Sequence, residues 1–319
     1  MTRAVPPVPS VPAHDVLAAG GLAPSGHNTQ PWILREDPAE PGCFEVRGDP
    51  ERTLPVSDPD HRALRVVCGA ALANMRLAVR ARGRRTHAHL LPDPADPWSL
   101  ARLRVGSALA PTDQEQVLAA AIPRRHSHRR AFAATPVSLA VRATLRRAAE
   151  AERAWAVWLD DPGLRRDAAA LVGQAHRAQR ADPDLRAEQR AWTGRPDGDP
   201  EGLGAGTAGP RPPAGDPWRV RDLTGGAGPP DRRDEALVLV LGTFHDQPLA
   251  HLQAGQALQR VLLTATAHGL AASFVAPPLE VPSIRGALRA LLGGALWPQA
   301  MLRLGHGSDT VATPRRPVD

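Results

Sequence analysis

The sequence has no lysine and no tyrosine, and its 319 residues include only two cysteines and four phenylalanines. Cys43 and Cys68 are too few for a disulfide framework or for a cysteine-rich metal cluster. No window approaches the roughly 18 consecutive apolar residues of a membrane helix, and residues 1–12 lack the apolar stretch of a signal peptide. We therefore expect a cytoplasmic protein that has no contact with a membrane.

All 39 basic residues are arginines, against 33 acidic residues, and the net charge is +6. A strongly basic sequence is typical of nucleic-acid-binding proteins. Here the arginines are interspersed with acids, as in Arg35-Glu36-Asp37, and the scarcity of aromatic residues leaves few platforms for stacking bases. Nucleic-acid binding is therefore the less favoured interpretation, and we expect no nucleic-acid partner.

Hydrophobic periodicity and turn residues divide the chain into alternating helices and strands. The predicted helices are 13–22, 62–82, 112–121, 136–150, 163–180, 183–193, 250–268 and 282–292. The predicted strands are 31–35, 44–48, 86–91, 101–106, 154–159, 235–243, a short strand closing at Val275, and 299–304. Helices interleaved with strands predict an α/β or α+β sandwich.

The composition shifts sharply to glycine and proline over about 194–230. A structureless insert of this length is usually a lid, a binding loop or disorder. Trp192 and Trp218 flank it or lie inside it, and a disordered linker rarely keeps such large apolar side chains, so we favour a lid. Residues 204–209 match G-x-G-x-x-G, but prolines surround them instead of a strand and a helix, so we expect no dinucleotide site there.

The segment Pro24-Ser25-Gly26-His27-Asn28-Thr29-Gln30-Pro31-Trp32 concentrates a hydroxyl, two amides and an indole. An amide carries both a donor and an acceptor. In an extended segment Asn28, Gln30 and Trp32 point the same way, which suits a heterocycle edge with alternating C=O and N–H groups, such as the pyrimidine of a flavin. The alternative is a helix end, a polar loop and the start of a strand.

Two arginine clusters are candidates for binding an anion. Arg124-Arg125-His126-Ser127-His128-Arg129-Arg130 follows Pro123, which ends the preceding helix, and Thr313-Pro314-Arg315-Arg316-Pro317 lies near the C-terminus. Guanidinium groups match phosphate oxygens bidentately, and the Ser127 hydroxyl adds a further donor. The two clusters could clamp one phosphate; the alternative is a solvated basic turn.

Other chemistry is poorly supported by the sequence. His87-Ala88-His89 has no carboxylate or cysteine at metal-ligand spacing, so we expect solvated histidines and no metal site. No G-x-S-x-G motif occurs, and Cys68 lies on an apolar helix face, where a buried thiol is the usual interpretation. The sequence therefore offers no hydrolase site.

Together these segments resemble the FMN-dependent nitroreductase superfamily. Pro24 to Trp32 resembles its flavin-contacting segment, and Arg125-His126-Ser127 with Arg129 and Ala131-Phe132 resembles its phosphate-binding segment. Gly269-Leu270-Ala271-Ala272-Ser273 is similar to its glycine turn beside the flavin ring. Leu304-Gly305-His306-Gly307 and Pro314-Arg315-Arg316-Pro317 are similar to its last strand and terminal basic pair.

The order of the segments departs from that family's usual pattern, because the arginine segment follows Pro24 to Trp32 by about a hundred residues. The resemblance is therefore to a duplicated, single-chain branch, that of actinobacterial NAD(P)H nitroreductases. It implies a three-layer α/β/α sandwich of α+β class, built from two fused half-repeats as an internal pseudo-dimer. The halves would be 1–110 and 111–319, with the lid in the second. One FMN site per chain, and a monomer or weak homodimer, would follow.

The resemblance also implies roles for individual residues. Ser25, Asn28 and Gln30 would contact the flavin ring or ribityl chain, Pro31 and Trp32 would pack nearby, and Ala271 would lie in the turn beside the ring. The phosphate ligands would be Arg125, Ser127, Arg129, Arg315 and Arg316. No residue stands out as a catalytic acid or base.

The implied activity is two-electron transfer from NAD(P)H, through flavin N5, to a nitroaromatic, a quinone or a related small molecule. The alternative is an FMN-binding protein that stores its flavin under the lid with little or no turnover.

Overall fold

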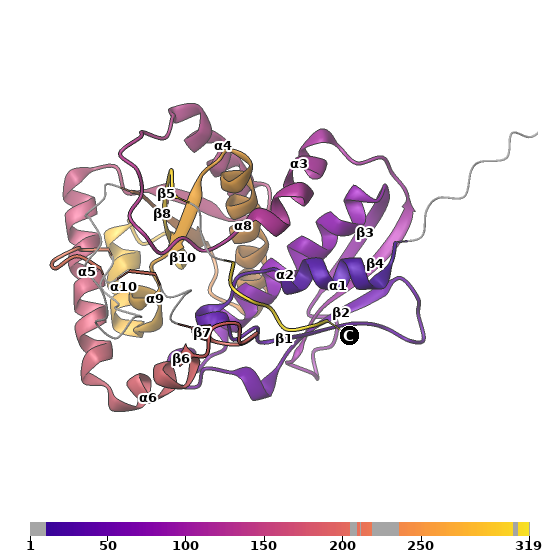
Figure 1. Ribbon diagram of the computed structural model, residues 1–319, viewed down its shortest axis with the longest axis horizontal. Helices are drawn as coiled ribbons and strands as arrows, with labels where there is room; N and C mark the ends of the chain where they lie inside the picture. Colours follow the sequence, from indigo (N-terminus) through magenta and orange to yellow (C-terminus); the bar gives the residue numbers. More distant parts are fainter. Residues whose placement is uncertain (1–10, 205–208, 211, 219–235, 309–311, 319) are drawn as a thin grey trace, which may run out of the picture.

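The structure, a computed structural model, describes residues 11–204, 209–210, 212–218, 236–308 and 312–318. Within these ranges the chain forms two four-stranded antiparallel sheets (Figure 1). The first has the order β1 (Trp32–Glu36), β2 (Cys43–Gly48), β4 (Ser99–Ala108), β3 (Arg84–Leu90). The second has the order β5 (Trp155–Trp158), β8 (Leu237–Thr243), β10 (Trp297–Gly305), β9 (Ala271–Phe274).

The two halves repeat one topology. In each half a helix precedes the first strand, a long helix links the second strand to the third, and the fourth strand lies between the second and third. The helices of the first half are α1 (Ala13–Gly21) and α2 (Arg62–Ala81), with the 3-10 turns η1 (Gly26–Asn28) and η2 (Pro50–Arg52). Those of the second half are α3 (Asp113–Ala121), α4 (Leu139–Glu150), α5 (Pro162–Ala181), α6 (Pro183–Trp192), α8 (Pro248–Ala267), α9 (Pro277–Glu280) and α10 (Pro282–Leu291), with the 3-10 turn η3 (Ile122–Arg124). A small parallel pair, β6 (Thr193–Arg195) and β7 (Leu203–Gly204), opens the insert.

The long helices α2 and α8 have 20 residues each and pack against each other at the centre of the molecule. Their contact is reciprocal. A Cβ on Gly69 would lie 2.2 Å from the Leu252 carbonyl oxygen, and a Cβ on Gly255 would lie 1.9 Å from that of Val66. Glycine is therefore required at both positions, and the matched three-residue spacing gives the two helices a local pseudo-twofold relation.

Both sheets bury the face that meets these helices. Phe44 and Leu103 pack with α2 in the first half, and Leu239 and Leu302 pack with α8 in the second. The opposite faces differ. In the second sheet that face packs on α5, α9 and α10, whereas in the first sheet it is polar and faces solvent, as is common for antiparallel sheets.

Most predicted elements are confirmed to within about three residues. The helix predicted over 136–150 begins at Leu139 instead of Pro136, because Ser138 caps it by accepting a hydrogen bond from the Val141 N–H. Among the helices that the structure describes, none is both long enough and apolar enough to cross a membrane.

Candidate functional site

A cavity of about 270 Å³ takes its wall from both halves of the chain. The first half contributes the loop before β1 and the start of α2; the second contributes residues 127–129, β9, α9 and β10. Described parts of the insert, Leu203, Pro210, Pro212 and Trp218, complete the wall. The lining is mostly apolar with a few convergent polar groups, which is the usual composition of a small-molecule site.

The segment 24–32 forms part of this wall as a tight turn and not as an extended strand. Residues Gly26–Asn28 make a 3-10 turn, and His27, Asn28 and Gln30 have positive φ. The Ser25 hydroxyl closes the turn by accepting a hydrogen bond from the Gln30 N–H at 3.0 Å. The prediction that Asn28, Gln30 and Trp32 point the same way is therefore wrong, because the local hydroxyl bond competes with extended backbone.

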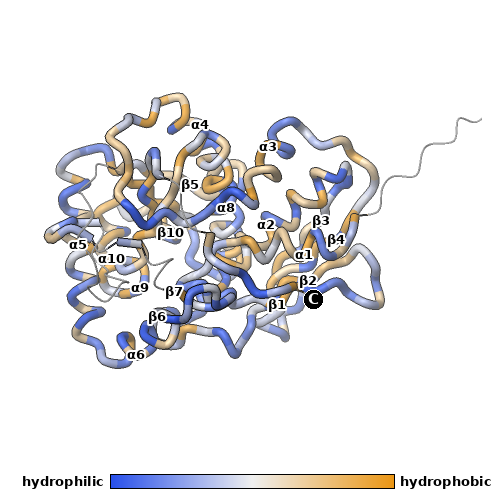
Figure 2. The backbone as a smooth tube through the Cα atoms, in the orientation of Figure 1, coloured by the Kyte–Doolittle hydropathy of each residue, from blue (hydrophilic) through white to orange (hydrophobic). Residues whose placement is uncertain are grey.

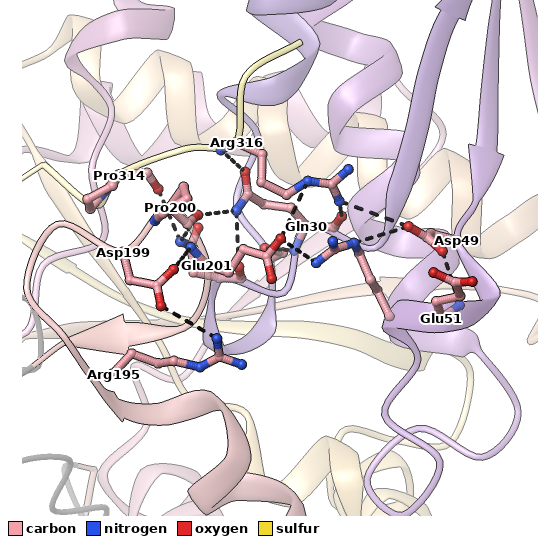
Figure 3. A network of polar contacts seen from close by, with 12 residues as sticks. Gln30, Asp49, Glu51, Arg195, Asp199, Pro200, Glu201, Pro314 and Arg316 are labelled. Carbon is pink, nitrogen blue, oxygen red and sulfur yellow. Dashed lines mark hydrogen bonds and ion pairs between the residues drawn. The ribbon is translucent and has the colours of Figure 1, made fainter. Parts of the chain in front are cut away.

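The two amides of this turn bind protein groups far away in the sequence. Asn28 donates to the carbonyl oxygens of Pro200 and Pro314, and its Oδ1 accepts a 2.7 Å bond from Arg315. Gln30 donates to the Pro200 carbonyl at 2.7 Å and accepts from the Arg316 N–H at 3.0 Å (Figure 3). Both side chains are buried. They join the turn to the base of the insert and to the C-terminal tail.

Ion pairs extend this junction. Glu201 lies 2.8 Å from Arg52 and 3.7 Å from Arg316, and Arg316 lies 3.9 Å from Asp49 (Figure 3). We call the set Asn28, Gln30, Pro200, Glu201 and Pro314–Arg316 the clasp.

Trp32 and Pro31 anchor the end of the turn in the core of the first half. Trp32 is buried in the core of the first half, beside the sheet and α2. The Pro31 carbonyl accepts the Asp49 N–H at 3.2 Å and faces the Cys68 thiol at 3.7 Å. Trp32 thus packs in the core of the first half and is not among the residues that line the cavity. Cys68 is fully buried, and burial raises the pKa of its thiol above its usual range.

Arg125 and Arg129 of one segment and Arg315 of the C-terminal tail converge beside the cavity. Arg125 is buried and donates to the Leu22 carbonyl at 3.1 Å; Arg129 lines the cavity; Arg315 donates to Asn28 and to Ala23. The Nε atoms of Arg125 and Arg315 are buried and have no hydrogen-bond partner among the described residues. Buried donors are normally satisfied, so these two indicate a missing acceptor.

The electrostatics of this arginine group point the same way. Burial, together with the charges of Arg315 and Arg129, lowers the pKa of Arg125 to about 9. Burial likewise lowers the pKa of Arg129 to about 10 and, with the charge of Arg129, that of Arg315 to about 10. All three remain cationic at neutral pH. A group of buried, mutually repelling cations is stabilised by an anion placed among them.

The turn after α8 holds the segment 127–129 in place. Gly269 ends that helix with φ +71, the conformation that favours glycine at this position. Ala271 begins β9, and Ala272 forms a parallel bridge with Ser127 while its carbonyl accepts the His128 N–H at 2.7 Å. Ser127 and Arg129 therefore lie beside β9. Gly209 of the insert lies against the Arg129 backbone, where a Cβ would clash.

No family model matches the sequence. The chain is 37% identical over 310 residues to the "Putative NAD(P)H nitroreductase Rv3131" of Mycobacterium tuberculosis, covering 94% of this chain and 88% of that protein. It is 31% identical to the "Putative NAD(P)H nitroreductase acg" of the same organism, covering 93% and 91%. The chain belongs to the NAD(P)H nitroreductase family. This confirms the resemblance that segments 24–32 and 125–129 carry.

Among solved structures, a Bacteroides fragilis nitroreductase with bound FMN is 14% identical, with a TM-score of 0.39, covering 63% of this chain and 94% of that one. The nitroreductase assignment rests on the mycobacterial relatives, and the α+β fold agrees with the two helix-covered antiparallel sheets.

The sequence interpretation assigned no role to several polar residues of the cavity wall, among them Arg62, Gln299 and Arg303. Each is a single polar residue inside a helix or strand pattern, so nothing local distinguishes it. Arg303 is fully buried and lies 5.0 Å from the Phe132 ring. A buried arginine at the centre of an apolar strand was the one signal that could have been used.

Two further predicted features lie outside the cavity or outside the described residues. His87 and His89 lie on β3, opposite Arg104 and Arg102, and the described ranges contain no group of three His, Cys, Asp or Glu side chains that could hold a metal. Of the insert at 194–230, residues 205–208, 211 and 219–230 lie outside the described residues, as does most of the G-x-G-x-x-G match.

Proposed function

We propose that this protein is an FMN-dependent oxidoreductase that passes two electrons from NAD(P)H to a nitroaromatic, a quinone or a related small acceptor. The observation that carries the proposal is the convergence of buried Arg125 with the half-buried Arg129 and Arg315 beside a mostly apolar cavity. FMN, when bound, supplies hydride transfer at its N5 atom. Family membership supports the same assignment, since the relatives carry the name NAD(P)H nitroreductase.

The residues present fit the phosphate of such a cofactor. Arg125, Arg129 and Arg315 supply cationic donors, two of them with an unused Nε–H, and Ser127 supplies a hydroxyl at the cavity wall. The backbone N–H of Arg316 donates to Gln30, and its guanidinium lies near the carboxylates of Glu201 and Asp49. We therefore assign Arg316 to the clasp and expect it to affect phosphate binding only indirectly.

The rest of the cavity suits a flat ring. Val66 and Leu258 from the two central helices and Val275 after β9 offer apolar contacts, while Ser25 offers a hydroxyl. Because Asn28 and Gln30 are engaged by the clasp, we propose that they act by shaping the Ser25 turn. Pro31 and Trp32 support that turn, and Ala271 places β9 next to Ser127.

We propose that residues 1–110 and 111–319 are the two fused halves, each incomplete alone. The first provides the Ser25 turn and α2, and the second provides the arginine segment, β9 and β10. Since both sides of the site come from one chain, dimerisation is unnecessary, and we expect a monomer with one site.

A second candidate function is flavin storage without turnover. It is favoured by the insert, because Pro210, Pro212 and Trp218 form part of the cavity wall and would cover a bound ring. An insert that stays closed would deny a nicotinamide the stacking contact that hydride transfer needs.

The test is anaerobic stopped-flow of the FMN-loaded protein with NADPH and NADH. Loss of the 450-nm absorbance within seconds, followed by reoxidation on adding a quinone, is the result that we expect. Bound flavin that neither nucleotide reduces would favour storage, and failure to bind FMN at all would overturn both candidates.

A further inference from the structure

Reduction of a quinone or a nitro group consumes protons as well as electrons, yet most of the cavity wall is apolar. Hydrophobic and hydrophilic residues alternate along α2 (Figure 2), and beyond its first turn the residues that reach the wall are Val66 and Val67. The described residues of the insert at the wall are apolar as well. A proton for the acceptor therefore comes either from solvent or from one of the few titratable side chains of the wall.

Apart from its arginines, which do not release their protons in proteins, the described wall has three titratable side chains, His27, His128 and Glu280. His128 is fully buried, and its Nε2 atom contacts the Ala131 carbonyl at 3.3 Å. The Glu280 carboxylate acts as an acceptor, for a 2.6 Å hydrogen bond from Gln179. His27 is half-buried at the wall. Imidazole is the side chain that most often transfers a proton in catalysis near neutral pH.

The turn that carries His27 is held in a conformation that few residues adopt. The φ angle is +47 at His27, +58 at Asn28 and +49 at Gln30, so three of four consecutive residues lie in the left-handed region. The clasp takes up the side chains of Asn28 and Gln30, whereas His27 lines the cavity. Strained backbone persists where the surroundings enforce it, and it gathers at functional sites. Here the enforced conformation presents the His27 side chain at the wall.

His27 lies at the part of the cavity where this turn meets the insert. Its neighbour Asn28 donates to the Pro200 carbonyl at 3.2 Å, and Leu203, three residues further along the insert, lines the same cavity. Trp218 of the insert also belongs to the wall. In the arrangement proposed above, a flat ring lies against the central helices, so the space between the ring and the insert is left for the acceptor. His27 borders that space.

We propose that His27 is the acid that protonates the electron acceptor. This assignment rests on the proposed function, in which a hydride reaches the acceptor from reduced FMN. A hydride added at one carbonyl oxygen of a quinone carries both electrons and leaves the second oxygen anionic. That oxygen takes a proton from the His27 imidazolium, which forms the second O–H bond of the hydroquinone. The neutral imidazole then regains a proton from water.

Anaerobic stopped-flow on FMN-loaded protein, reduced with light so that no nicotinamide is needed, tests this role. Duroquinone takes up a hydride and a proton, whereas ferricyanide takes up single electrons and no proton. His27→Gln keeps a hydrogen-bond donor but has no acid, so it should slow reoxidation by duroquinone by about a hundredfold and leave reoxidation by ferricyanide unchanged. His89→Gln, exposed on β3 outside this cavity, is the matched control and should behave as wild type.

Calorimetric titration of the oxidised protein with duroquinone is a second readout, which does not depend on turnover. His27→Gln should keep the dissociation constant of the wild type, because the amide still donates to the quinone oxygen. His27→Phe should bind duroquinone more weakly. A loss of rate in His27→Gln without a loss of affinity assigns the effect to proton transfer.

Three results would overturn the role of His27 as an acid. They are an unchanged duroquinone rate in His27→Gln, an equal loss of rate with ferricyanide, and a loss of duroquinone affinity as large as the loss of rate. Failure of the proposed function looks different. Bound FMN that neither NADPH nor NADH reduces would contradict that function, while the light-reduced protein still reports on His27. A protein that binds no FMN would overturn both.

Discussion

The two halves of this chain share one strand order and one central helix length. They differ in what covers the face of each sheet that points away from the central helices. The second half covers that face with α5, α9 and α10 and with part of the insert, and α9 and the insert also contribute to the cavity wall. The first half leaves it polar and open. The difference shows how a duplicated fold keeps one site: the added helices and insert enclose one sheet only.

Matched positions make the contrast concrete. Arg303 lies opposite Ser273 on the second sheet, as Arg104 lies opposite His87 on the first. Arg303 is 1% exposed and lines the cavity, whereas the Arg104 side chain is 60% exposed and pairs with Glu40. The same place in the repeat therefore carries a buried cation in one half and a surface ion pair in the other.

The largest effect is expected where the halves meet. Gly69→Ala or Gly255→Ala places a Cβ about 2 Å from a backbone oxygen of the other helix, so α2 and α8 must separate. We expect each to lower the free energy of unfolding by about 3 kcal/mol or more. Urea denaturation measures this.

Gly286→Ala is the control, because nothing lies within 4 Å of a Cβ at this position in α10. It should be neutral or stabilise by about 0.5–1 kcal/mol through helix propensity. Equal, small effects at all three glycines would mean that the helices do not meet at Gly69 and Gly255.

The next effect is on FMN affinity, and it distinguishes Arg315 from its neighbour Arg316 in the C-terminal tail. Arg125→Met and Arg315→Met should each weaken FMN binding at least about tenfold, since each removes a charged hydrogen bond to the phosphate. Arg316→Met should change the FMN dissociation constant much less, because this side chain faces Asp49 and Glu201. Fluorescence titration of FMN measures all three. If Arg316→Met is the most damaging, the assignment of the two residues is reversed.

A smaller effect tests the clasp. Gln30→Ala removes the bonds to the Pro200 carbonyl and to the Arg316 N–H. Leaving those groups unpaired should cost about 1–2 kcal/mol, and it should loosen the insert and the tail together. Hydrogen exchange should then rise in both 193–204 and 312–318. Faster exchange confined to one segment would show that Gln30 does not couple them.

The smallest effect concerns an ion pair across the boundary of the halves, between Arg80 of α2 and Glu115 of α3, at 2.7 Å. The hydrogen bond from Arg80 lowers the pKa of Glu115 to about 2, against an ordinary value of 4.5. The pair therefore stabilises the fold fully above about pH 4.5 and is lost as the pH falls toward 2. With discounting for solvent, it is worth about 1 kcal/mol.

Glu115→Gln should accordingly be less stable than wild type at pH 7, with the gap closing by pH 2. Urea titrations at several pH values follow it. A gap that is unchanged between pH 7 and pH 2 would mean that the charge of Glu115 contributes nothing.

Local sequence signals were sufficient for most of the fold. Helix α8 was predicted over 250–268 and spans Pro248–Ala267, since apolar spacing and Gly269 define it. The shape of 24–32 could not be predicted in this way. Its form depends on one hydrogen bond accepted by the Ser25 hydroxyl and on partners up to 287 residues away.

In the candidate site, too, local sequence signals indicated some residues, whereas others depend on contacts between distant parts of the chain. Clustered residues such as Arg125, Ser127 and Arg129 could be proposed from the sequence because neighbouring arginines indicate an anion. Arg62 and Arg303 were not, because each becomes significant only when folding buries it at the cavity wall. Arg315 and Arg316 are adjacent in sequence, yet they have different partners, which no pattern in the sequence could separate.

The central claim is that two similar halves make one complete site. Calorimetric titration of the full chain with FMN measures the number of sites directly. The account predicts one FMN per chain. Two FMN per chain would show that the open face of the first half also forms a site, and no binding would show that the buried arginine group serves another anion.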